Sequence, residues 1–213
     1  MNLPAPLEPF VLAGLHVRLD PLSMSHVDAL VSAASVSRVH YEVAVVPATL
    51  EAMTAYVRGA LDDQAAGTVL AFATVAVPSE GVVGSTRFMN IERWRWPAKS
   101  ELQRPPERPD AVEIGATWLA HDAQRTGLNT EAKLLMLSHA FERWNVHRVT
   151  IKTDVRNERS RAAIERLGAK LDGILRSHSP SATGTVRDTA YYSIVKSEWS
   201  EVRGRLEMRL ARG

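Results

Sequence analysis

The chain lacks cysteine entirely over its 213 residues, which excludes disulfides, thiolate metal sites and a cysteine nucleophile. It also lacks any apolar run near the ~20 residues that a membrane-spanning helix needs. The proline-rich stretch from Met1 to Pro9 has no basic segment at its start, so we expect no signal peptide. Together these absences favour a cytoplasmic protein without a membrane partner.

The charge of the chain is nearly balanced, with a formal net charge of +2 and a mildly basic pI near 9.1. A balance this small does not indicate a nucleic-acid partner. The seven histidines show no metal-ligand spacing, so we expect no metal. The hydrophobic fraction of 45% and the charged fraction of 23% are ordinary for a globular chain, and the length suits one sizeable domain.

Periodicity along the chain predicts strands and helices in mixed order, with an irregular stretch at 35–47. The predicted strands cover 15–19, 68–77, 82–91, 112–119, 147–154, 169–179 and 187–196. The predicted helices begin at Ser25, Thr49, Lys133, Asn157 and Trp199, the last being a C-terminal helix over about 197–211. This order predicts one α/β domain over 1–213, with a central mixed sheet and helices on both faces.

A polar turn, 123–132, leads from the predicted strand 112–119 into a strongly apolar helix. A turn that contains a glycine, here Gly127, and opens a helix aims several unpaired backbone N–H groups at one point, which makes an anion site. No Gly-Lys-Ser/Thr follows, and Gly127 stands alone, so the turn is neither a P-loop nor a dinucleotide loop. A lone glycine can also be a plain turn, with Asn129 or Thr130 as an ordinary helix cap.

The segments after this turn strengthen the prediction of an anion site. A Val-, Ile- and Thr-rich strand is followed by a helix that Asn157 begins, and Gly168 stands where that helix should stop. The order from Val112 to Ala169 resembles the GCN5-related N-acetyltransferases, whose pyrophosphate loop reads Gln/Arg-x-x-Gly-x-Gly/Ala. The corresponding residues here are Gln124-Arg125-Thr126-Gly127-Leu128-Asn129, with Asn in place of the final Gly or Ala.

The resemblance extends over roughly 15–199. The stretches Glu113-Ile114-Gly115-x-x-Trp118-Leu119 and Asn129-Thr130-Glu131-Ala132 are similar to the RimJ/RimL-type branch, which includes enzymes that acetylate the N-termini of ribosomal proteins. The resemblance implies the acetyltransferase fold and acetyl-CoA as co-substrate. It also implies these cofactor-binding residues: Trp118, Leu119, Gln124, Arg125, Thr126, Gly127, Leu128, Asn129, Thr130, Asn157 and Ser160. At Gly127 we expect a Cβ to block the close approach of the pyrophosphate.

Acetyl transfer to an amine needs a base, because only the neutral amine attacks. Glu113 is the catalytic candidate, since it is acidic within an apolar strand and alternation puts it on the face of Gly115 and Thr117. The alternative is a structural Glu paired with an arginine. No general acid is evident: many relatives have Tyr where Ile164 stands, so we expect the thiolate to leave with help from dipoles and water.

The segment Glu92–Ala111 is a long connection with two tryptophans, Trp94 and Trp96, and four prolines. Such density of proline prevents regular structure, and long connections are often functional. The tryptophans could pack on this monomer, on a second subunit of a homodimer, or over the acceptor. We predict that the segment folds back over the sheet, borders the acceptor site and leaves the cofactor untouched.

Two classes of function remain open on the sequence. The first is an N-acetyltransferase that moves an acetyl group from acetyl-CoA to a primary amine, either a protein or peptide N-terminus or a small amine such as an amino acid, polyamine or aminoglycoside. The second is a non-catalytic module that binds acyl-CoA, which the missing Tyr would suit. Because fold alone does not separate the two, only turnover does.

Overall fold

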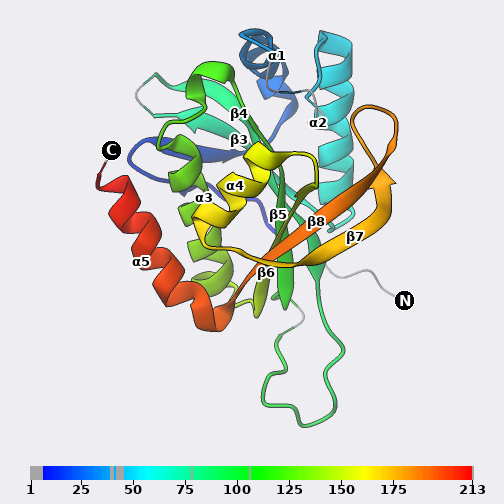
Figure 1. Cartoon of the computed structure of the whole chain (residues 1–213), viewed down its shortest axis with the longest axis vertical. Helices are drawn as coiled ribbons and strands as arrows, with labels where there is room; N and C mark the ends of the chain where they lie inside the picture. Colours follow the sequence, from blue (N-terminus) through cyan, green and yellow to red (C-terminus); the bar gives the residue numbers. More distant parts are fainter. Residues whose placement is uncertain (1–6, 39–40, 42–45, 78, 106, 213) are drawn as a thin grey trace.

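The structure is a computed structural model that describes residues 7–38, 41, 46–77, 79–105 and 107–212. Within these residues one sheet of eight strands runs through the molecule, in the order β1-β2-β3-β4-β5-β6-β8-β7 (Figure 1). The pair β5 and β6 is parallel, and every other neighbouring pair in this part of the chain is antiparallel. The predicted mixed sheet is therefore confirmed. Residues 1–6, most of 39–45, Pro78 and Pro106 lie outside the described residues, so the predictions for them are not addressed.

The strands are β1 (Leu12–Ala13), β2 (Val17–Pro21), β3 (Leu70–Ala76), β4 (Gly81–Glu92), β5 (Ala111–Leu119), β6 (Arg148–Asp154), β7 (Lys170–Pro180) and β8 (Val186–Val195). The α-helices are α1 (Val27–Ser35), α2 (Leu50–Ala65), α3 (Leu128–Ser138), α4 (Glu158–Leu167) and α5 (Trp199–Leu210). Short helical turns are η1 (Met24–His26), η2 (His121–Ala123) and η4 (Lys196–Glu198), and η3 (His139–Arg143) is a π-helix that prolongs α3. None of the described helices is long and apolar enough to cross a membrane.

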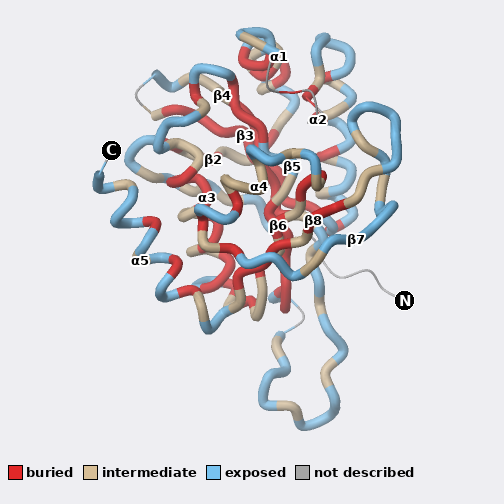
Figure 2. The backbone as a smooth tube through the Cα atoms, viewed as in Figure 1, coloured by how far each residue is buried: buried red, intermediate tan, exposed pale blue. Residues whose placement is uncertain are grey.

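Two hydrophobic cores lie on opposite faces of the sheet. On one face, Phe72 and Phe88 pack with α3, α4 and α5; on the other, Ala71 and Ala73 pack with α1 and α2. All seven residues of β3 are buried, as predicted for a strand covered on both faces, and Figure 2 shows the burial concentrated along the central strands. The helices thus cover both faces of the sheet, so the ends of the central strands are the parts of the sheet that remain accessible.

Several helix ends follow local sequence signals. The Thr49 hydroxyl accepts a hydrogen bond from the Ala52 N–H at 3.2 Å, and Gly168 ends α4 in the left-handed region at φ 98°. Two predicted starts are wrong. Ser25 lies inside η1, which Ser23 precedes, and the helix expected from Lys133 already begins at Leu128. The first turn of α3 is polar, so the hydrophobic pattern does not identify it as part of the helix. Its polar residues are buried through tertiary packing, which no local pattern shows.

The central strands β5 and β6 separate after a short parallel pairing. They pair at three positions, of which Glu113 with Thr150 is the last. Beyond that point β5 continues along β4 to Leu119, while β6 continues along β8. The register of β5 on β4 also shifts near Ala116, whose φ of 47° marks a bulge. The result is a wedge between β5 and β6, which opens toward the turn before α3.

The connection 93–110 projects beyond the ends of β4 and β5, away from the sheet (Figure 1). The predicted folding back over the sheet is therefore wrong. Its base is anchored at Asp110, whose carboxylate accepts hydrogen bonds from the Trp94 N–H at 2.7 Å and the Trp96 indole at 2.9 Å. The Trp94 ring stacks on His147 with centroids 5.5 Å apart. Both tryptophans thus pack on their own monomer.

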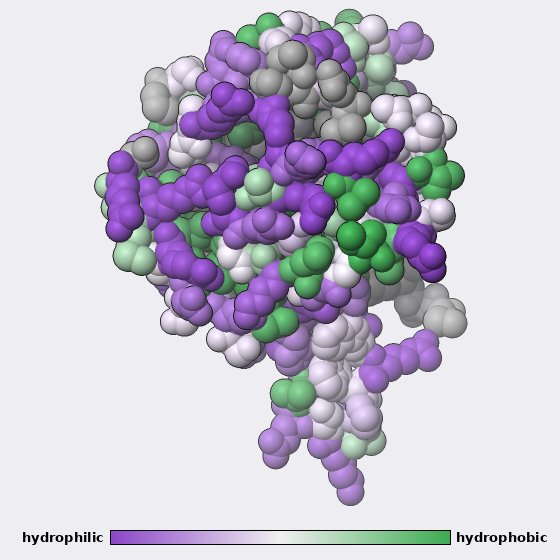
Figure 3. Space-filling model, viewed as in Figure 1, coloured by the Kyte–Doolittle hydropathy of each residue, from purple (hydrophilic) through white to green (hydrophobic). Residues whose placement is uncertain are grey.

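Strand β7 forms the free edge of the sheet and carries exposed apolar side chains. Leu171, Ile174 and Leu175 are each nearly half exposed, and Figure 3 shows hydrophobic surface over this strand. The cores described above do not include these side chains. The edge is therefore stabilised by its pairing with β8 rather than by packing on its outer face.

Candidate active site

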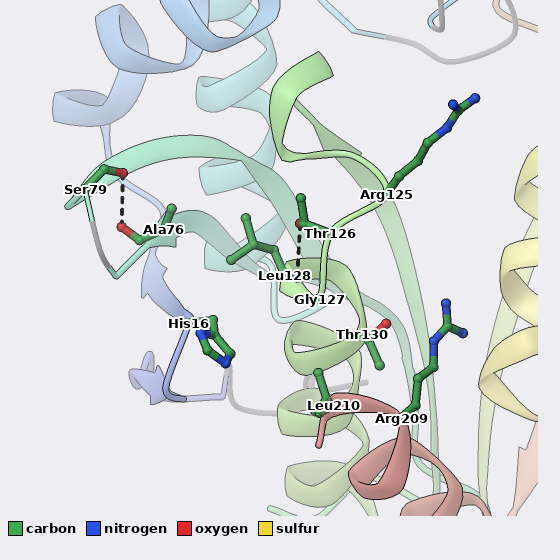
Figure 4. Close-up of a pocket in the computed structure, with 10 residues that line it drawn as sticks. All are labelled: His16, Ala76, Ser79, Arg125, Thr126, Gly127, Leu128, Thr130, Arg209 and Leu210. Atoms are coloured by element: carbon green, nitrogen blue, oxygen red, sulfur yellow. Dashed lines mark hydrogen bonds between the residues drawn. The ribbon is translucent and has the colours of Figure 1, made fainter. Parts of the chain in front are cut away.

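A cavity of about 600 Å³ lies between the end of β5, the turn before α3 and one side of α4 along its length. It is lined by these predicted cofactor-binding residues: Trp118, Leu119, Gln124, Arg125, Thr126, Asn129, Thr130, Asn157 and Ser160. Gly127 and Leu128 line an adjoining cavity of about 470 Å³, which the turn shares with the end of α5 (Figure 4). All predicted cofactor-binding residues therefore gather around one turn, although they come from β5, α3 and α4.

Side chains of the turn hold its own backbone in shape. The Gln124 amide donates to the Leu119 carbonyl at 2.9 Å, which ties the turn to the end of β5. The Thr126 hydroxyl donates to the Ala123 carbonyl at 2.8 Å and accepts from the Leu128 N–H at 3.3 Å. The first helical bond of α3 runs from the Glu131 N–H to the Gly127 carbonyl, and the Leu128 N–H is taken by Thr126. The N–H groups of Asn129 and Thr130 therefore remain as the donors of the first turn. These donors and the helix dipole make an anion site.

Gly127 is not required by the fold itself. Its φ of −64° suits any residue, and a Cβ there would have only an ordinary contact, 3.6 Å from a Leu210 methyl carbon. Any need for glycine at this position must therefore come from a bound ligand. The predicted role of Gly127 in a close approach of phosphate stays a prediction.

Four arginines line the main cavity, and the sequence analysis named one of them. Arg125 lies on the turn, Arg159 and Arg166 lie on α4, and Arg209 comes from α5. Figure 4 shows the Arg125 and Arg209 side chains extending to the same side of the turn, and Figure 3 shows mainly hydrophilic surface over α4. Guanidinium groups suit phosphate oxygens, so a multiply phosphorylated ligand fits this wall. Arg209 could not be found from sequence, because only the fold returns α5 to the turn.

Asn129 gives a further sign of a ligand. Its side-chain oxygen is buried and has no hydrogen-bond partner in the described part of the chain. An orphaned buried acceptor is costly, and an N–H group of a bound molecule would satisfy it. The pantetheine arm of coenzyme A carries such amide N–H groups. Asn129, where the sequence departs from the family pattern, therefore fits coenzyme A.

The wall on β5 is shaped by its packing against Tyr41, which lines the same cavity. Trp118 is 5% exposed, and its ring meets Tyr41 edge-on with centroids 6.3 Å apart. The Tyr41 hydroxyl donates to the Leu119 carbonyl at 2.8 Å, and burial raises the pKa of Tyr41. Both Trp118 and Leu119 thus line the cavity from a rigid strand end, while Tyr41 is a lining residue that sequence reasoning missed.

The α4 side of the cavity contains no tyrosine in the expected place. Asn157 caps α4, its side-chain oxygen accepting from the Ser160 N–H at 3.0 Å. Ile164 is 4% exposed and belongs to the core. The Tyr192 hydroxyl lies within hydrogen-bond distance of Arg161 and Glu165, outside the cavity lining. None of these side chains gives the cavity a general acid.

Glu113 lies in a separate hollow of about 250 Å³, which it shares with Trp94, Lys152 and Tyr191. Its Oε2 accepts from the Asn90 amide at 2.6 Å and lies 2.7 Å from the Lys152 ammonium. Burial is the largest single influence and opposes the charge on Lys152, but the Glu113 carboxylate and Tyr191 together outweigh it, so the pKa of Lys152 is raised. Glu113 is therefore an ion-paired carboxylate whose partner is a lysine rather than the expected arginine.

The predicted common face is confirmed for Glu113 and Gly115, since a Cβ on Gly115 would lie 3.1 Å from the Glu113 Oε1, but it is wrong for Thr117. The bulge at Ala116 interrupts the alternation, so Glu113 faces Asn90 and Lys152, whereas Thr117 faces Lys133 on α3. Glu113 and Thr117 thus serve different hollows. The stretch 114–116 of β5 separates them, and the bulge there frees backbone groups from the ladder.

No group of three or more potential metal ligands occurs among the described residues. The anion-binding turn, the arginine wall and the split strands define the class of protein as one that binds a phosphorylated cofactor beside a split sheet. A family model described as "Acetyltransferase (GNAT) domain" matches residues 16–170. The chain therefore belongs to the GNAT acetyltransferase family, whose members use acetyl-CoA.

Three similar proteins show how sequence identity and structural similarity vary among the matches. "Putative ribosomal N-acetyltransferase YdaF" of Bacillus subtilis (strain 168) is 38% identical over 88 residues, which cover 41% of this chain and 47% of that protein. The match thus spans about half the length of that relative. A GCN5-related N-acetyltransferase from Brucella melitensis superposes with a TM-score of 0.80 at 27% identity, covering 97% of this chain and 89% of that one. A RimL structure, named as a ribosomal L7/L12 alpha-N-protein acetyltransferase in complex with coenzyme A, shares the fold alone, with a TM-score of 0.68, 20% identity, and 87% and 98% of the two chains covered.

The predicted superfamily, fold and enzyme class are thereby confirmed. Family membership favours an acetyl-CoA-dependent acyltransferase over the non-catalytic module. The site residues themselves stay predictions, since the comparisons name none of them.

Proposed function

We propose that this enzyme transfers the acetyl group of acetyl-CoA to the amino group of a protein or peptide N-terminus, in the cytoplasm. The observation that carries the proposal is the placement of two hollows along one strand. The arginine-lined cavity begins at Thr117 of β5, and the hollow of Glu113 ends at that residue of the same strand. An acyl donor in the first and an amine in the second would meet over the bulge between them.

The first hollow would hold the donor. Backbone N–H groups of the turn and of α3 would bind the pyrophosphate, while Arg159, Arg166 and Arg209 would add charge. The pantetheine arm would then run along the strand end toward Thr117, past Asn129. At the bulge, a backbone N–H group released from the β4–β5 ladder would stabilise the negative charge that develops on the thioester carbonyl.

The second hollow would hold the acceptor. Two carboxylates, Glu92 and Glu113, and two cations, Arg148 and Lys152, line it. It therefore suits an acceptor that carries both an amine and a carboxylate or carbonyl group. Trp94 gives the hollow an aromatic wall from the projecting connection. This wall belongs to the base of the segment that we predicted to border the acceptor site, and none of the described residues of 93–110 lines the cofactor cavity. A peptide chain could extend from the hollow along that segment.

Glu113 would act as the base. Asn90 and Lys152 fix its Oε2, whereas a Cβ placed on Gly115 would lie 3.1 Å from its Oε1. Oε1 thus sits beside the bulge, where an attacking amine would have to pass. Glycine at 115 leaves the carboxylate this room, since a Cβ would also come within 2.8 Å of the Met89 sulfur.

A small amine is the second candidate acceptor, and the size of the hollow favours it. A volume of about 250 Å³ is small for a substrate pocket and would fit one amino acid or a short polyamine. The same volume also fits the first residue of a peptide whose remainder lies outside. The two acceptors therefore differ in whether contacts beyond the hollow contribute to binding.

The test measures coenzyme A release with a panel of free peptides, the same peptides blocked at the N-terminus, and small amines. We expect turnover with free peptides and none with blocked ones. Glu113→Gln should lower kcat/KM by ~10²–10⁴ and flatten its acidic limb, because a positioned base is lost. Glu80→Gln, which changes an exposed carboxylate on the β3–β4 turn, is the matched control.

Binding of acetyl-CoA should be nearly unchanged in Glu113→Gln, as calorimetry would show. An unaltered pH–rate profile in this variant would assign Glu113 to the ion pair with Lys152 alone. If the wild type binds coenzyme A yet releases none with any amine, the proposed function is wrong. Faster turnover of small amines than of peptides would decide for the second candidate.

A further inference from the structure

Lys133 is a buried lysine without a carboxylate partner among the described residues. It lies on α3, is 4% exposed, and its ammonium donates to the Thr117 hydroxyl at 2.6 Å and the Thr86 hydroxyl at 3.1 Å. Burial lowers the pKa of Lys133 to about 7. Keeping such a group in the interior is costly, and perturbed groups of this kind gather at functional sites. The reaction described so far leaves Lys133 without a role.

Thr117 connects Lys133 to the cofactor cavity. An ammonium can only donate, so the oxygens of Thr86 and Thr117 both accept from Lys133. The two hydroxyls lie 2.8 Å apart, and when Thr86 donates to Thr117, the Thr117 proton is left to the Gly115 carbonyl, 3.4 Å away, or to an acceptor in the cavity. Thr117 lines the cavity, so its O–H can be directed there. A single hydroxyl group, that of Thr117, therefore connects the Lys133 ammonium to the cavity by hydrogen bonds.

Thr117 also lies at the end of the cavity where the sulfur is expected. Three consecutive β5 residues line the cavity, and Thr117 is the one farthest from the anion-binding turn. A cofactor whose phosphates occupy that turn must place its other end near Thr117. This step rests on the proposed function, and it puts the Thr117 hydroxyl next to the departing sulfur.

We propose that Lys133, acting through the hydroxyl of Thr117, protonates the sulfur of coenzyme A as it leaves. When the C–S bond breaks, its electron pair goes to sulfur. Sulfur takes the proton of the Thr117 hydroxyl, and that oxygen takes a proton from the Lys133 ammonium. Lys133 is left neutral, and coenzyme A leaves as the thiol. The bond that replaces C–S is the new C–N bond to the acceptor. The acceptor nitrogen loses two protons, one from the ammonium before attack and one when the tetrahedral intermediate collapses to the amide, and Glu113 or water takes them. One of the two offsets the proton that Lys133 later regains from solvent, and the other is released to solvent.

The relay accounts for the missing tyrosine. Ile164 occupies the position from which many relatives present an acid, and it is buried in the core. Lys133 approaches the same cavity from α3, on the far side of Thr117. Lys133 is therefore a positioning and proton-supplying residue that does not itself touch the substrate.

The charged groups of α3 and of the strands packed against it are engaged with other partners, so burial alone changes the pKa of Lys133. On α3, Glu131 is engaged by backbone N–H groups of the β1–β2 turn. On the packed strands, Arg87 faces Tyr56, Glu113 faces Lys152, and Arg18 pairs with Asp20. Across the cavity, the lining contains the arginines of the turn, α4 and α5. The pKa of Lys133 is lowered by burial and not by any of these charges.

The kinetic test compares Lys133→Met, Thr117→Val and Thr117→Ser with the wild type. We expect the first two to lower kcat about 100-fold, within the range for general acids, and to leave KM for acetyl-CoA within about threefold. Wild-type kcat should fall as the pH rises through the Lys133 pKa of about 7, and this alkaline limb should vanish in Lys133→Met and Thr117→Val. Thr117→Ser keeps the hydroxyl and should keep both rate and limb. Lys170→Met, at an exposed lysine on β7, is the matched control.

If Thr117→Val and Lys133→Met keep wild-type kcat and the alkaline limb, the relay is overturned. Should Lys133→Met fail to fold, Thr117→Val, which retains Lys133 and its volume, decides the question alone. Equal loss of kcat in Thr117→Ser and Thr117→Val would also overturn the proposal, because the hydroxyl would then be irrelevant.

A second measurement needs no turnover and so separates this inference from the proposed function. Lysine labelled with ¹³C at Cε gives one resonance that Lys133→Met removes. We expect its position near pH 7 to differ between the complexes with coenzyme A and with desulfo-coenzyme A, which lacks the thiol. In Thr117→Val the two complexes should give the same position. Identical positions in the wild type would show that Lys133 does not sense the sulfur, even if the enzyme is active.

Discussion

At the residue scale, Glu131 belongs to a motif that the sequence linked to cofactor binding, but its own role is structural. It belongs to the stretch Asn129-Thr130-Glu131-Ala132, yet its carboxylate faces away from the cavity. The N–H groups of Leu15, His16 and Val17 each donate to it at 2.8 Å. Glu131 therefore fastens α3 to the first strands of the sheet. A Cβ on Gly14 would lie 2.5 Å from this carboxyl carbon, which is why the turn has glycine there.

Replacing this carboxylate should destabilise the protein without touching the chemistry. Glu131→Gln keeps the volume but presents an amide N–H₂ to backbone donors, so part of the charged hydrogen bonding is lost. We expect the free energy of unfolding to fall by about 2–4 kcal/mol, since hydrogen bonds to charged groups are worth about 1.5–3 kcal/mol each. Denaturant unfolding measures it, and coenzyme A affinity by calorimetry is the control. Weaker coenzyme A binding with unchanged stability would contradict the structural role.

At the element scale, the sequence predicted what local physics determines. The caps of α2 and α4, the continuous burial of β3 and the turn before α3 all follow from residues within a few positions of one another. The anion-binding turn could be found because its glycine, its polar residues and the flanking elements are contiguous. Arg209 and Lys133 could not, because α5 and the buried face of α3 reach the cavity only through tertiary packing.

The bulge at Ala116 had the largest effect on the candidate site. Strict alternation put Glu113 and Thr117 on one face, and one extra residue in β5 moves them to opposite faces. A non-glycine residue at positive φ carries no local signal, since the bulge is set by pairing with β4. The alternation of β5 therefore identified Glu113 as a site residue, but it placed Thr117 on the wrong face of the strand.

The base of the projecting connection supports another prediction. Trp94 is 41% exposed, stacks on His147 and lines the hollow of Glu113. Trp94→Ala should therefore raise KM for the acceptor about 3- to 10-fold, the effect of losing one aromatic contact. KM for acetyl-CoA should stay the same. Steady-state kinetics with both substrates varied measures the two constants.

The matched control is Leu102→Ala, which trims an exposed side chain farther along the connection. It should change neither constant. An equal rise in both KM values for Trp94→Ala would mean that the connection acts on the cofactor cavity. No change in either constant would remove Trp94 from the acceptor site.

At the scale of the whole molecule, the two cores determine where charge can be placed. The core between the sheet and α3, α4 and α5 is closed around Lys133, while the wedge between β5 and β6 keeps Thr117 at the cavity. The protein therefore holds an ionisable group inside its main core. Such a group links the folding free energy of the whole chain to pH.

The sign of this link follows from the two pKa values of Lys133. Burial lowers the pKa in the folded protein from the ordinary 10.5 to about 7. Between these values the unfolded chain binds one more proton than the folded chain at this position, so the contribution of Lys133 to stability rises with pH. The rise is at most ~1.4 kcal/mol per pH unit. Below pH 7 both states hold the proton, and the full cost of burying the ammonium remains.

Lys133→Met removes this term and leaves the other titrating groups in place. The difference in unfolding free energy between wild type and variant should therefore move in favour of the wild type from pH 7 to pH 9, by about 1–3 kcal/mol. Denaturant unfolding at pH 7, 8 and 9 gives this difference, and Lys170→Met should show none of it because that lysine is 74% exposed. A constant difference across this range would mean that Lys133 keeps its proton in the folded state. In that case the group could still donate to Thr117, but the alkaline limb of kcat would have to arise from another residue.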